Sequence, residues 1–468
     1  MEITPIGWIL IPLGVILFFA NPTWLYVLTI FFAPFSATAV VNIGSGEATS
    51  GVQAYLMFAT LLITQKLLNA LLRLKVGFPK KIRKPLWLLF LFVATCLASL
   101  VMPLWINGRL QITSPLLTDM ATTPLIFSST NITGVVYLVI GTCLTAIVAK
   151  TTLDAEKFHQ AVKIYVISGV FISLWAVLQL TCGIAHIPYP AAIFNSSKTP
   201  SALGYAAELE LVKIPKISSV AVESSMLAAS LLTMIPLGFA SFFGSGYVLG
   251  RRLDKWIFGL MVVALVLSTS STAYVGVCIF LLLGARYLVK FHRLHFKYAL
   301  LVIVLIAVAL TSYALVPQVQ LIAQELLLNK ASGYSALERA KTIYYAFGYF
   351  TQYPILGVGW SSVTSHDTIV KLLSNCGILG LLAFSAFIFS IARSLQGQIG
   401  LLATNMHNNP FDNYALIMFI VLIMMLSIAV MDGFPYVFGH FWVVLGLAIS
   451  APNMHGNDAY FLNRKNVA

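Results

Sequence analysis

Apolar residues run along this 468-residue chain in long continuous stretches that are separated by short polar segments. About 18 to 20 apolar residues are enough to cross a bilayer as a helix, whereas a membrane β-barrel shows short segments of alternating polarity. The pattern therefore predicts an all-α, polytopic integral membrane protein with about 12 to 13 transmembrane helices. The expected spans are residues 6–20, 22–40, 52–72, 85–105, 133–149, 161–182, 225–243, 256–269, 272–289, 298–316, 376–393, 414–431 and 436–451.

The composition points to the same class of protein. Charged residues make up 9% of the chain, against about 25% in a typical soluble domain. The five cysteines lie in or beside apolar runs and include no C-x-x-C pair, so neither a disulfide framework nor a zinc site is predicted. The first apolar run follows Glu2 rather than a basic segment, which favours a span over a cleaved signal peptide.

The net charge of +13 raises the possibility of nucleic-acid binding, but most of the cations lie in short loops between the predicted spans. Thirteen spans place these basic loops on one side of the membrane, which the positive-inside rule makes cytoplasmic. Orientation and attraction to anionic membrane lipids explain the charge, and no nucleic-acid partner is expected. The opposite side receives the three longest loops, at residues 106–132, 183–224 and 317–375. We expect residues 1–468 to form one membrane domain with a helical external loop at 317–375.

That loop contains the stretch that departs most from the spanning pattern. The motif Ser335-x-x-Glu338 is a capping box and predicts the start of a helix, which ends before Pro354 because proline cannot continue it. A glycine turn follows, and a second helical run enters the membrane at Ile378. A basic helix, a turn and one histidine at a membrane face are compatible with a site for a phosphorylated substrate.

Three side chains of this loop are candidates for chemistry. Arg339 and Lys341 can bind a pyrophosphate, since arginine binds phosphate oxygens bidentately and lysine acts as a point charge. The alternatives are contact with anionic headgroups or pairing with Glu338. His366 can accept a proton from an attacking hydroxyl, or it can be an interfacial residue that is hydrogen-bonded to Asp367.

Two further regions carry polar residues at predicted outer boundaries. Glu223 can orient or deprotonate a hydroxyl, but it can equally cap the helix that follows. We interpret Asp432 as a simple turn residue. The chain has no Walker A loop, H-E-x-x-H or G-x-S-x-G motif, and no paired acids on an outer loop, so we expect neither a metal nor another cofactor.

The motifs around these residues resemble a known family. Arg339…Tyr353-Pro-Ile-Leu-Gly-Val-Gly359…Ser365-His-Asp…Cys376-Gly-Ile-Leu-Gly-Leu-Leu382 resembles the signature region of the O-antigen polymerase and O-antigen ligase superfamily. Lys216…Ala221-Val-Glu223-Ser-Ser resembles the basic and E-x-S element of its polymerases. The similarity covers roughly residues 216–390. It departs from the family at Ser270-Ser271, where members often have Ser-Arg, and at Asp367, where Asn is common.

The resemblance implies a metal-independent glycosyltransferase of the bacterial inner membrane, with its site on the periplasmic face. Its substrate would be an undecaprenyl-pyrophosphate-linked oligosaccharide, polymerised into exopolysaccharide, capsule or O-antigen, and its partners would include a chain-length regulator and a flippase. Arg339 would steady the pyrophosphate leaving group, and His366 would match the family histidine. By the same resemblance Glu223 joins His366 as a catalytic residue, and Lys341, Lys216 and Ser224 join Arg339 as substrate-binding residues.

Two other functions stay open at the level of sequence. An O-antigen ligase shares the scaffold but transfers glycan to the lipid A core, and the E-x-S element at Glu223 favours the polymerase. A flippase for lipid-linked oligosaccharides would perform no chemistry. Transporters tend to carry ionisable groups at mid-membrane and internal repeats, and this chain has no evident repeat and almost no charge inside its predicted spans.

Overall fold

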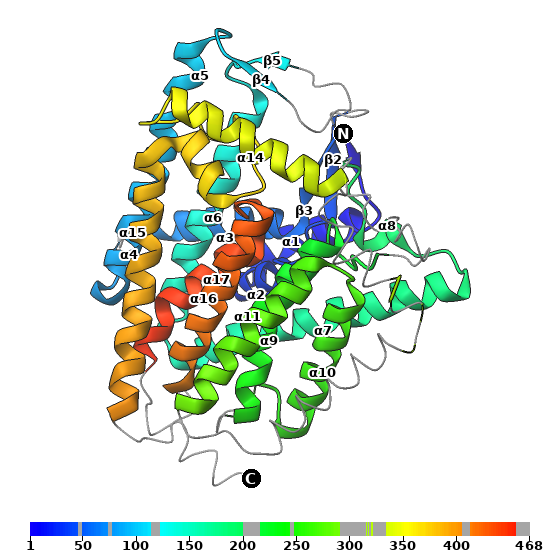
Figure 1. Ribbon diagram of the computed structural model, residues 1–468. Coiled ribbons are helices and arrows are strands. Elements are labelled where there is room, and N and C mark those ends of the chain that lie inside the picture. Colours follow the sequence, from blue (N-terminus) through cyan, green and yellow to red (C-terminus); the bar gives the residue numbers. More distant parts are fainter. Residues whose placement is uncertain are drawn as a thin grey trace.

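The computed structural model of the protein describes residues 1–44, 49–73, 77–113, 122–199, 216–243, 248–290, 334–404 and 412–454, together with Leu315, Pro317, Gln320 and Leu321. Within this part most residues are helical, and long helices run side by side as a bundle (Figure 1). The predicted span at 298–316 lies outside the described residues, apart from Leu315.

Six helical segments in the described part are long and apolar enough to cross a membrane. They are Ala54–Leu72, Lys80–Ile106, Ser129–Thr151, Ala155–Ala185, Thr368–Ile399 and Tyr414–Asp432. Each overlaps a span that the hydropathy pattern predicts. The chain is therefore a mainly helical membrane protein, as the sequence indicates.

These segments belong to α3 (Ala54–Arg73), α4 (Lys80–Ser99) with α5 (Val101–Ile106), α6 (Ser129–Thr151), α7 (Ala155–Ala185), α15 (Thr368–Thr404) and α16 (Asp412–Asp432). The remaining helices lie outside these six segments. They are α1 (Gly7–Ala20), α2 (Pro22–Phe32), α8 (Ala191–Phe194), α9 (Ser224–Phe243), α10 (Arg251–Leu267), α11 (Ser271–Lys290), α14 (Tyr334–Gln352) and α17 (Gly439–Ser450), followed by the 3₁₀ turn Ala451–Asn453.

Two of the predicted spans have a different structure. The helix predicted at 22–40 ends at Phe32, because Pro34 cannot continue it, and the chain goes on into a strand at Ala39. The apolar run at 436–451 forms α17, a 12-residue helix in which every residue is buried. It is an interior helix that packs against α6 and α16, so its hydrophobicity reflects the protein core.

Short strands also modify the all-α prediction. β1 (Glu2–Ile3), β2 (Ala39–Ile43) and β3 (Ser50–Gln53) form an antiparallel sheet in that order, and β4 (Gln111–Thr113) pairs with β5 (Thr122–Pro124). β2 carries Val40 and Val41, whose branched side chains favour extended backbone. The segment after α8 joins the first sheet, since the Ala39 amide donates to the Ser196 hydroxyl at 3.1 Å.

Two contacts join polar segments that the loop charges place on the same side of the membrane. The Lys150 ammonium donates to the Gly77 carbonyl at 3.2 Å, which joins two of the basic loops. The Thr113 amide donates to the Tyr349 hydroxyl at 2.8 Å, which joins the loop at 106–132 to α14. Figure 1 shows α14 lying across one end of the bundle, near α5, β4 and β5. Which membrane face this end occupies stays a prediction.

From Tyr334 onward, the loop predicted to carry the site has the local structure expected from its sequence. α14 ends at Gln352, ahead of Pro354, and Gly357 and Gly359 adopt φ values of +65° and +107° in the turn that follows. The side chain of Ser335, and with it the predicted capping box, lies outside what the structure describes.

The following helix is interrupted at Gly377, where φ is +64° and ψ is −166°. A side chain at this position would collide with the Ile355 carbonyl, so only glycine lets the turn pack against α15. The Ile378 amide, freed by the interruption, donates to the Pro354 carbonyl at 2.8 Å. This hydrogen bond holds the turn after α14 against α15.

Candidate functional site

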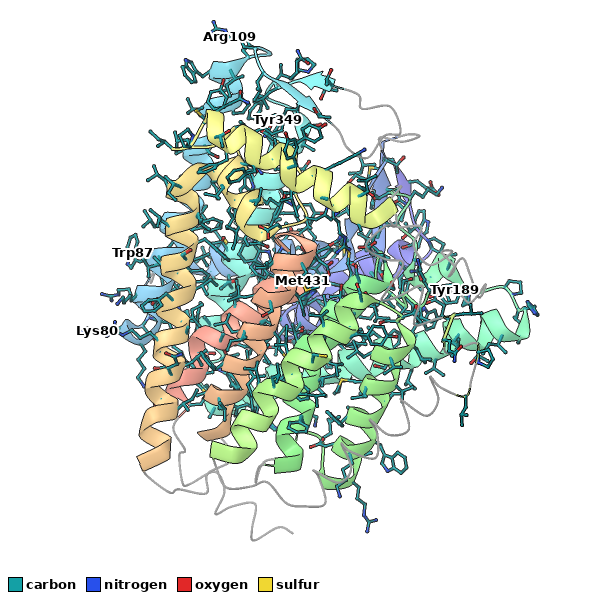
Figure 2. All side chains as sticks on the ribbon, viewed as in Figure 1. Lys80, Trp87, Arg109, Tyr189, Tyr349 and Met431 are labelled. Atoms are coloured by element: carbon teal, nitrogen blue, oxygen red, sulfur yellow. The ribbon has the colours of Figure 1, made fainter. Side chains whose placement is uncertain are left out.

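A cavity of about 100 Å³ opens where α9, α14 and α16 meet the segment that precedes α15. Glu223, Arg339 and His366, which the sequence analysis singles out, all line it although they come from separate parts of the chain. Its polar lining also includes Thr233, Asp432 and His440, and much of the remaining wall is apolar. Figure 2 labels Met431 at the end of α16 that lies beneath α14, which locates the cavity in the fold.

Arg339 is held at the end of α16 by two interactions. Its Nη1 group donates to Asp432 Oδ1 at 2.8 Å and to the Met431 carbonyl at 3.1 Å. The free carbonyls at a helix C-terminus attract cations, so this end of α16 favours binding of a guanidinium. The other carboxylate oxygen of Asp432 accepts a hydrogen bond from the Thr272 hydroxyl at 2.9 Å.

This arrangement corrects the interpretation of Asp432 as a simple turn residue. It is the last residue of α16 and the ion-pair partner of Arg339, and its side chain is 18% exposed against 26% for the arginine. The alternative pairing of Arg339 with Glu338 is also wrong, because no salt bridge between these two is found in the described part of the chain. Arg339 therefore enters the cavity with its charge largely compensated.

His366 is oriented by α14 through a chain of two hydrogen bonds. The Thr342 hydroxyl donates to the Arg339 carbonyl at 2.8 Å, and the Thr342 Oγ1 atom lies 3.0 Å from His366 Nδ1. A hydroxyl has one proton to donate, so with that proton on the Arg339 carbonyl Nδ1 is the donor in the second bond. The neutral imidazole then carries its free lone pair on Nε2. The expected pairing of the histidine with Asp367 is not found, because the Asp367 carboxylate accepts from the Val370 amide at 2.7 Å and starts α15.

The electrostatic surroundings favour the neutral form of this histidine. Burial lowers the pKa of His366 below its ordinary value of 6.5, the charges of Arg339 and Lys371 lower it further, and the charge of Asp432 opposes them. An imidazole that is neutral at physiological pH can accept a proton directly. His366 is thus equipped to act as a base through Nε2.

Close backbone contact brings His366 against the end of α16. Gly433 follows Asp432 with φ of +89°, and a Cβ atom there would lie 2.8 Å from the Ser365 carbonyl. A left-handed φ and this lack of space both favour glycine. Gly433 therefore allows the histidine segment and the Arg339–Asp432 pair to meet in one cavity.

Glu223 lies at the exposed edge of the cavity, at the start of α9. Its backbone carbonyl accepts from the Met226 amide at 3.1 Å, and its carboxylate accepts from the Ser225 hydroxyl at 2.6 Å. It therefore lies at the helix start, as the alternative interpretation expected, and also faces the cavity. Burial raises the pKa of Glu338, the charge of Arg339 opposes this, and the charge of Glu223 adds to it, so the two carboxylates share one electrostatic environment.

The other three predicted site residues do not line the cavity. Lys341 lies two positions beyond Arg339 on α14 and is partly buried elsewhere on the helix, as expected for side chains at that spacing. Lys216 is partly buried ahead of α9, and Ser224 is the first residue of that helix. The cavity thus brings together both predicted catalytic residues and one of the four predicted substrate-binding residues.

His440 is a cavity residue that sequence reasoning missed. It is buried in α17, its Nδ1 lies 3.4 Å from the Ser230 hydroxyl, and its ring stacks on Phe438 with centroids 5.8 Å apart. An available signal was the presence of an ionisable side chain inside a predicted span, which by default marks a functional position. Thr342 carried no such signal, because a hydroxyl on a helix is common.

In the described residues, no group of three or more His, Cys, Asp or Glu side chains is placed to hold a metal ion. The cavity instead offers a compensated guanidinium, a neutral imidazole and a carboxylate at its edge. Together these groups can bind an anion and remove a proton from a hydroxyl. Comparison of the chain with protein-family models and with curated proteins finds no match, so the resemblance described above depends on the motif residues alone.

Proposed function

We propose that this protein is a membrane glycosyltransferase that polymerises undecaprenyl-pyrophosphate-linked oligosaccharide units. The observation that carries the proposal is the convergence of Arg339, His366 and Glu223 on one cavity. Transfer from a glycosyl pyrophosphate needs a base for the acceptor hydroxyl and positive charge for the departing diphosphate. The cavity contains a candidate for each role.

In the proposed reaction, His366 Nε2 takes the proton of the acceptor sugar hydroxyl as that oxygen attacks the anomeric carbon of the donor. The bond between this carbon and the pyrophosphate oxygen breaks, and the electron pair leaves with the diphosphate. Arg339 uses Nη1 for Asp432 and Met431, which leaves the N–H groups of Nε and Nη2 to bind the leaving group. Glu223, at the edge of the cavity, is placed to bind hydroxyls of the incoming sugar.

The outer face of α14 supplies a surface for the lipid part of such a substrate. Tyr344 and Phe347 are 75% and 49% exposed on this helix, while Thr342 and Ala346 are buried on its inner side. A hollow of about 740 Å³ lies along α14 beside Tyr344, Phe347 and Val370. An aromatic, apolar surface next to the cavity suits a polyprenyl chain whose pyrophosphate enters the site from the membrane interface.

The proposal assigns the α14 end of the bundle to the external face of a bacterial inner membrane, and the basic loops to the cytoplasm. Membrane lipids would surround the six long apolar helices. A chain-length regulator and a flippase would be partners in the same process. Each of these assignments follows from the loop charges and the family resemblance.

The test uses a deletion strain in which the glycan is displayed on a gel. Loss of a polymerase leaves single repeat units and no ladder. Long chains retained on the lipid carrier would indicate a ligase, and single units trapped on the cytoplasmic leaflet would indicate a flippase. Either of these results would overturn the proposal.

The site is tested by complementation with single variants at matched membrane levels. Arg339→Ala and His366→Ala should fail to restore the ladder, because one removes the cation for the leaving group and the other removes the base. Lys80→Ala is the control, since Lys80 is exposed at the start of α4 and away from the cavity (Figure 2). Full-length polymer from both site variants would show that the cavity is not the active site.

A further inference from the structure

The cavity of the candidate site continues inward between two helices. It is lined by α9 from Met226 to Thr233 and by α16 from Met425 to Asp432, and these helices pack against each other (Figure 1). Each of these stretches is about 10 Å long at a rise of about 1.5 Å per residue. Arg339 pairs with Asp432 at the outer end, so Thr233 and Met425 mark an inner end about two helical turns away.

His440 contributes an imidazole to this inner end. It lies in the first turn of α17, where its amide donates to the Ala33 carbonyl at 3.1 Å. Its Nδ1 lies 3.4 Å from the hydroxyl of Ser230, which belongs to the stretch of α9 that lines the cavity. The side chain of His440 is buried and nevertheless lines the cavity, so it faces an internal space rather than the surface of the protein.

The imidazole of His440 has unused hydrogen-bonding capacity. A neutral imidazole has one donor and one acceptor nitrogen. Nδ1 has the long contact with Ser230, and Nε2 has no hydrogen-bond partner among the residues that the structure describes. Thr233, the other polar side chain of the inner end, is engaged, because it donates to the Ser230 carbonyl at 2.7 Å and lies 2.6 Å from the Tyr165 hydroxyl. A buried polar group without a partner is unfavourable, so His440 favours a ligand that supplies a donor or an acceptor.

The surface around His440 is suited to a sugar rather than to an anion. Phe438 also lines the cavity, and its ring stacks on the His440 ring with an interplanar angle of 13°. Met425 adds a further apolar side chain, whereas Arg339, the basic residue of the described lining, lies at the outer end. A sugar has hydroxyl groups and C–H faces, so an imidazole among apolar side chains matches both of its surfaces.

Buried structure closes the inner end of the cavity. Thr233, Met425 and His440 are 1%, 4% and 5% exposed, and Tyr165 and every residue of α17 are buried as well. A closed end can accept the last sugar of an oligosaccharide but not a middle one, which is bonded on both sides. In the proposed reaction the reacting sugar of the donor is bonded to the pyrophosphate and to the rest of the glycan. The acceptor reacts through its terminal sugar, so the closed end fits the acceptor.

We propose, with the proposed function as the premise, that the inner end of the cavity binds the terminal sugar of the acceptor and that His440 determines specificity for it. Nε2 of His440 would form a hydrogen bond with a hydroxyl or acetamido group of this sugar, and Phe438 would contact one of its C–H faces. The reacting hydroxyl of the same sugar would then lie towards His366 at the outer end. His440 thus binds the acceptor, and it neither takes the proton nor binds the diphosphate.

The test measures binding of two probes to the purified full-length protein in detergent. One probe is the repeat-unit oligosaccharide of the host's own glycan, released from lipid and pyrophosphate by mild acid, and the other is inorganic pyrophosphate. His440→Leu removes both ring nitrogens, and His440→Gln places an amide close to the position of Nε2. We expect His440→Leu to weaken oligosaccharide binding by about tenfold or more, which corresponds to at least about 1.4 kcal/mol, and to leave pyrophosphate binding unchanged. His440→Gln should retain most of the oligosaccharide affinity.

Two controls show whether the effect belongs to the terminal sugar. After an exoglycosidase has removed that sugar, the oligosaccharide should bind the unmodified protein and His440→Leu equally weakly. His159→Leu is the matched substitution, because His159 lies on α7 outside the described lining of the cavity, with its Nδ1 atom 3.0 Å from the Tyr414 hydroxyl. This variant should leave both affinities unchanged.

The ratio of the two affinities does not depend on the fraction of folded protein, so it stays informative if His440→Leu is less stable. Three results would overturn the inference: no binding of the oligosaccharide to the unmodified protein, an unchanged oligosaccharide affinity in His440→Leu, or an equal loss of affinity for both probes. The last result would indicate a purely structural role of His440.

The proposed function is judged separately by the glycan ladder of the deletion strain. A normal ladder in that strain, together with a loss in His440→Leu that depends on the terminal sugar, would retain the sugar site and reject the polymerase. A missing ladder together with an unchanged oligosaccharide affinity in His440→Leu would retain the polymerase and reject the sugar site.

Discussion

The ion pair between Arg339 and Asp432 allows structural and functional roles of the arginine to be separated. We consider Arg339→Gln, Asp432→Asn and the double variant, which remove one or both charges; Asn has the shape of Asp, and Gln is shorter than Arg but keeps a hydrogen-bonding amide. Each single variant leaves one charge without its partner at the end of α16. The double variant removes both charges and retains amide groups that can still hydrogen-bond.

The exposure of the pair sets the expected magnitude. Exposed pairs contribute about 0–1 kcal/mol, whereas removal of one partner from a fully buried pair costs about 3–5 kcal/mol. The two side chains are 26% and 18% exposed, their contact is 2.8 Å, and each makes a further hydrogen bond. We therefore expect each single variant to lose about 2–3 kcal/mol of stability, and the double variant to lie within about 1 kcal/mol of the unmodified protein.

The assay combines unfolding of the purified protein in detergent with the glycan ladder in complemented deletion cells. The double variant should recover stability and membrane level, yet build no ladder, because Arg339 is needed for the leaving group. A double variant that is stable and also active would refute the assigned role of Arg339. Additive stability losses would refute the ion pair itself.

The remaining predictions concern the base, its pH dependence and the packing around it. His366→Asn should abolish chain growth at a normal membrane level, as measured by the ladder. The pKa of His366 is lowered from 6.5, so the imidazole stays neutral as the pH falls below 6.5 and becomes protonated only near its lower folded-state pKa. The activity should therefore persist below pH 6.5. A pH–rate profile whose acid limb lies above pH 6.5 would contradict this. Asp432→Asn removes the charge that raises this pKa, so the acid limb of its residual activity should move to still lower pH. Gly433→Ala should lower the stability of the protein by at least about 1 kcal/mol in the unfolding assay, because Gly433 has a left-handed φ and a close backbone contact. Gly348 lies within α14 and meets open space, so Gly348→Ala should stabilise the protein by up to about 1 kcal/mol in the same assay. Phe347→Glu should weaken use of the lipid-linked substrate, measured as a higher apparent KM, and leave binding of inorganic pyrophosphate unchanged.

Local signals in the sequence predicted much of the segment that carries the site. Pro354 ends α14 and the two glycines form the turn, because both effects depend on the backbone of a few neighbouring residues. Arg339 and His366 could be selected from the sequence because their side chains can bind anions or protons and because they lie in a loop between predicted spans. Their residue types indicated an anion site and a base.

The partners of these residues could not be predicted in the same way. Asp432 stands 93 positions after Arg339, and nothing local distinguishes an ion-pair partner from a carboxylate in a turn. The link from Thr342 to His366 likewise depends on how α14 lies over the segment before α15. The position of the Lys371 ammonium over the Tyr436 ring, outside both ion pairs found in the described residues, likewise depends on packing between distant segments.

The amino-acid sequence alone determined that this is a helical membrane protein. The transfer of long apolar runs out of water is favourable whether they end up in lipid or in the protein interior. The sequence did not determine that α17 is buried on every side, since the interior of a protein and the lipid of a membrane are similarly apolar. Only the tertiary structure decided which polar side chains share the cavity. Hydrogen bonds and ion pairs act over a few ångströms in space, and the distance along the chain between their partners carries no information about them.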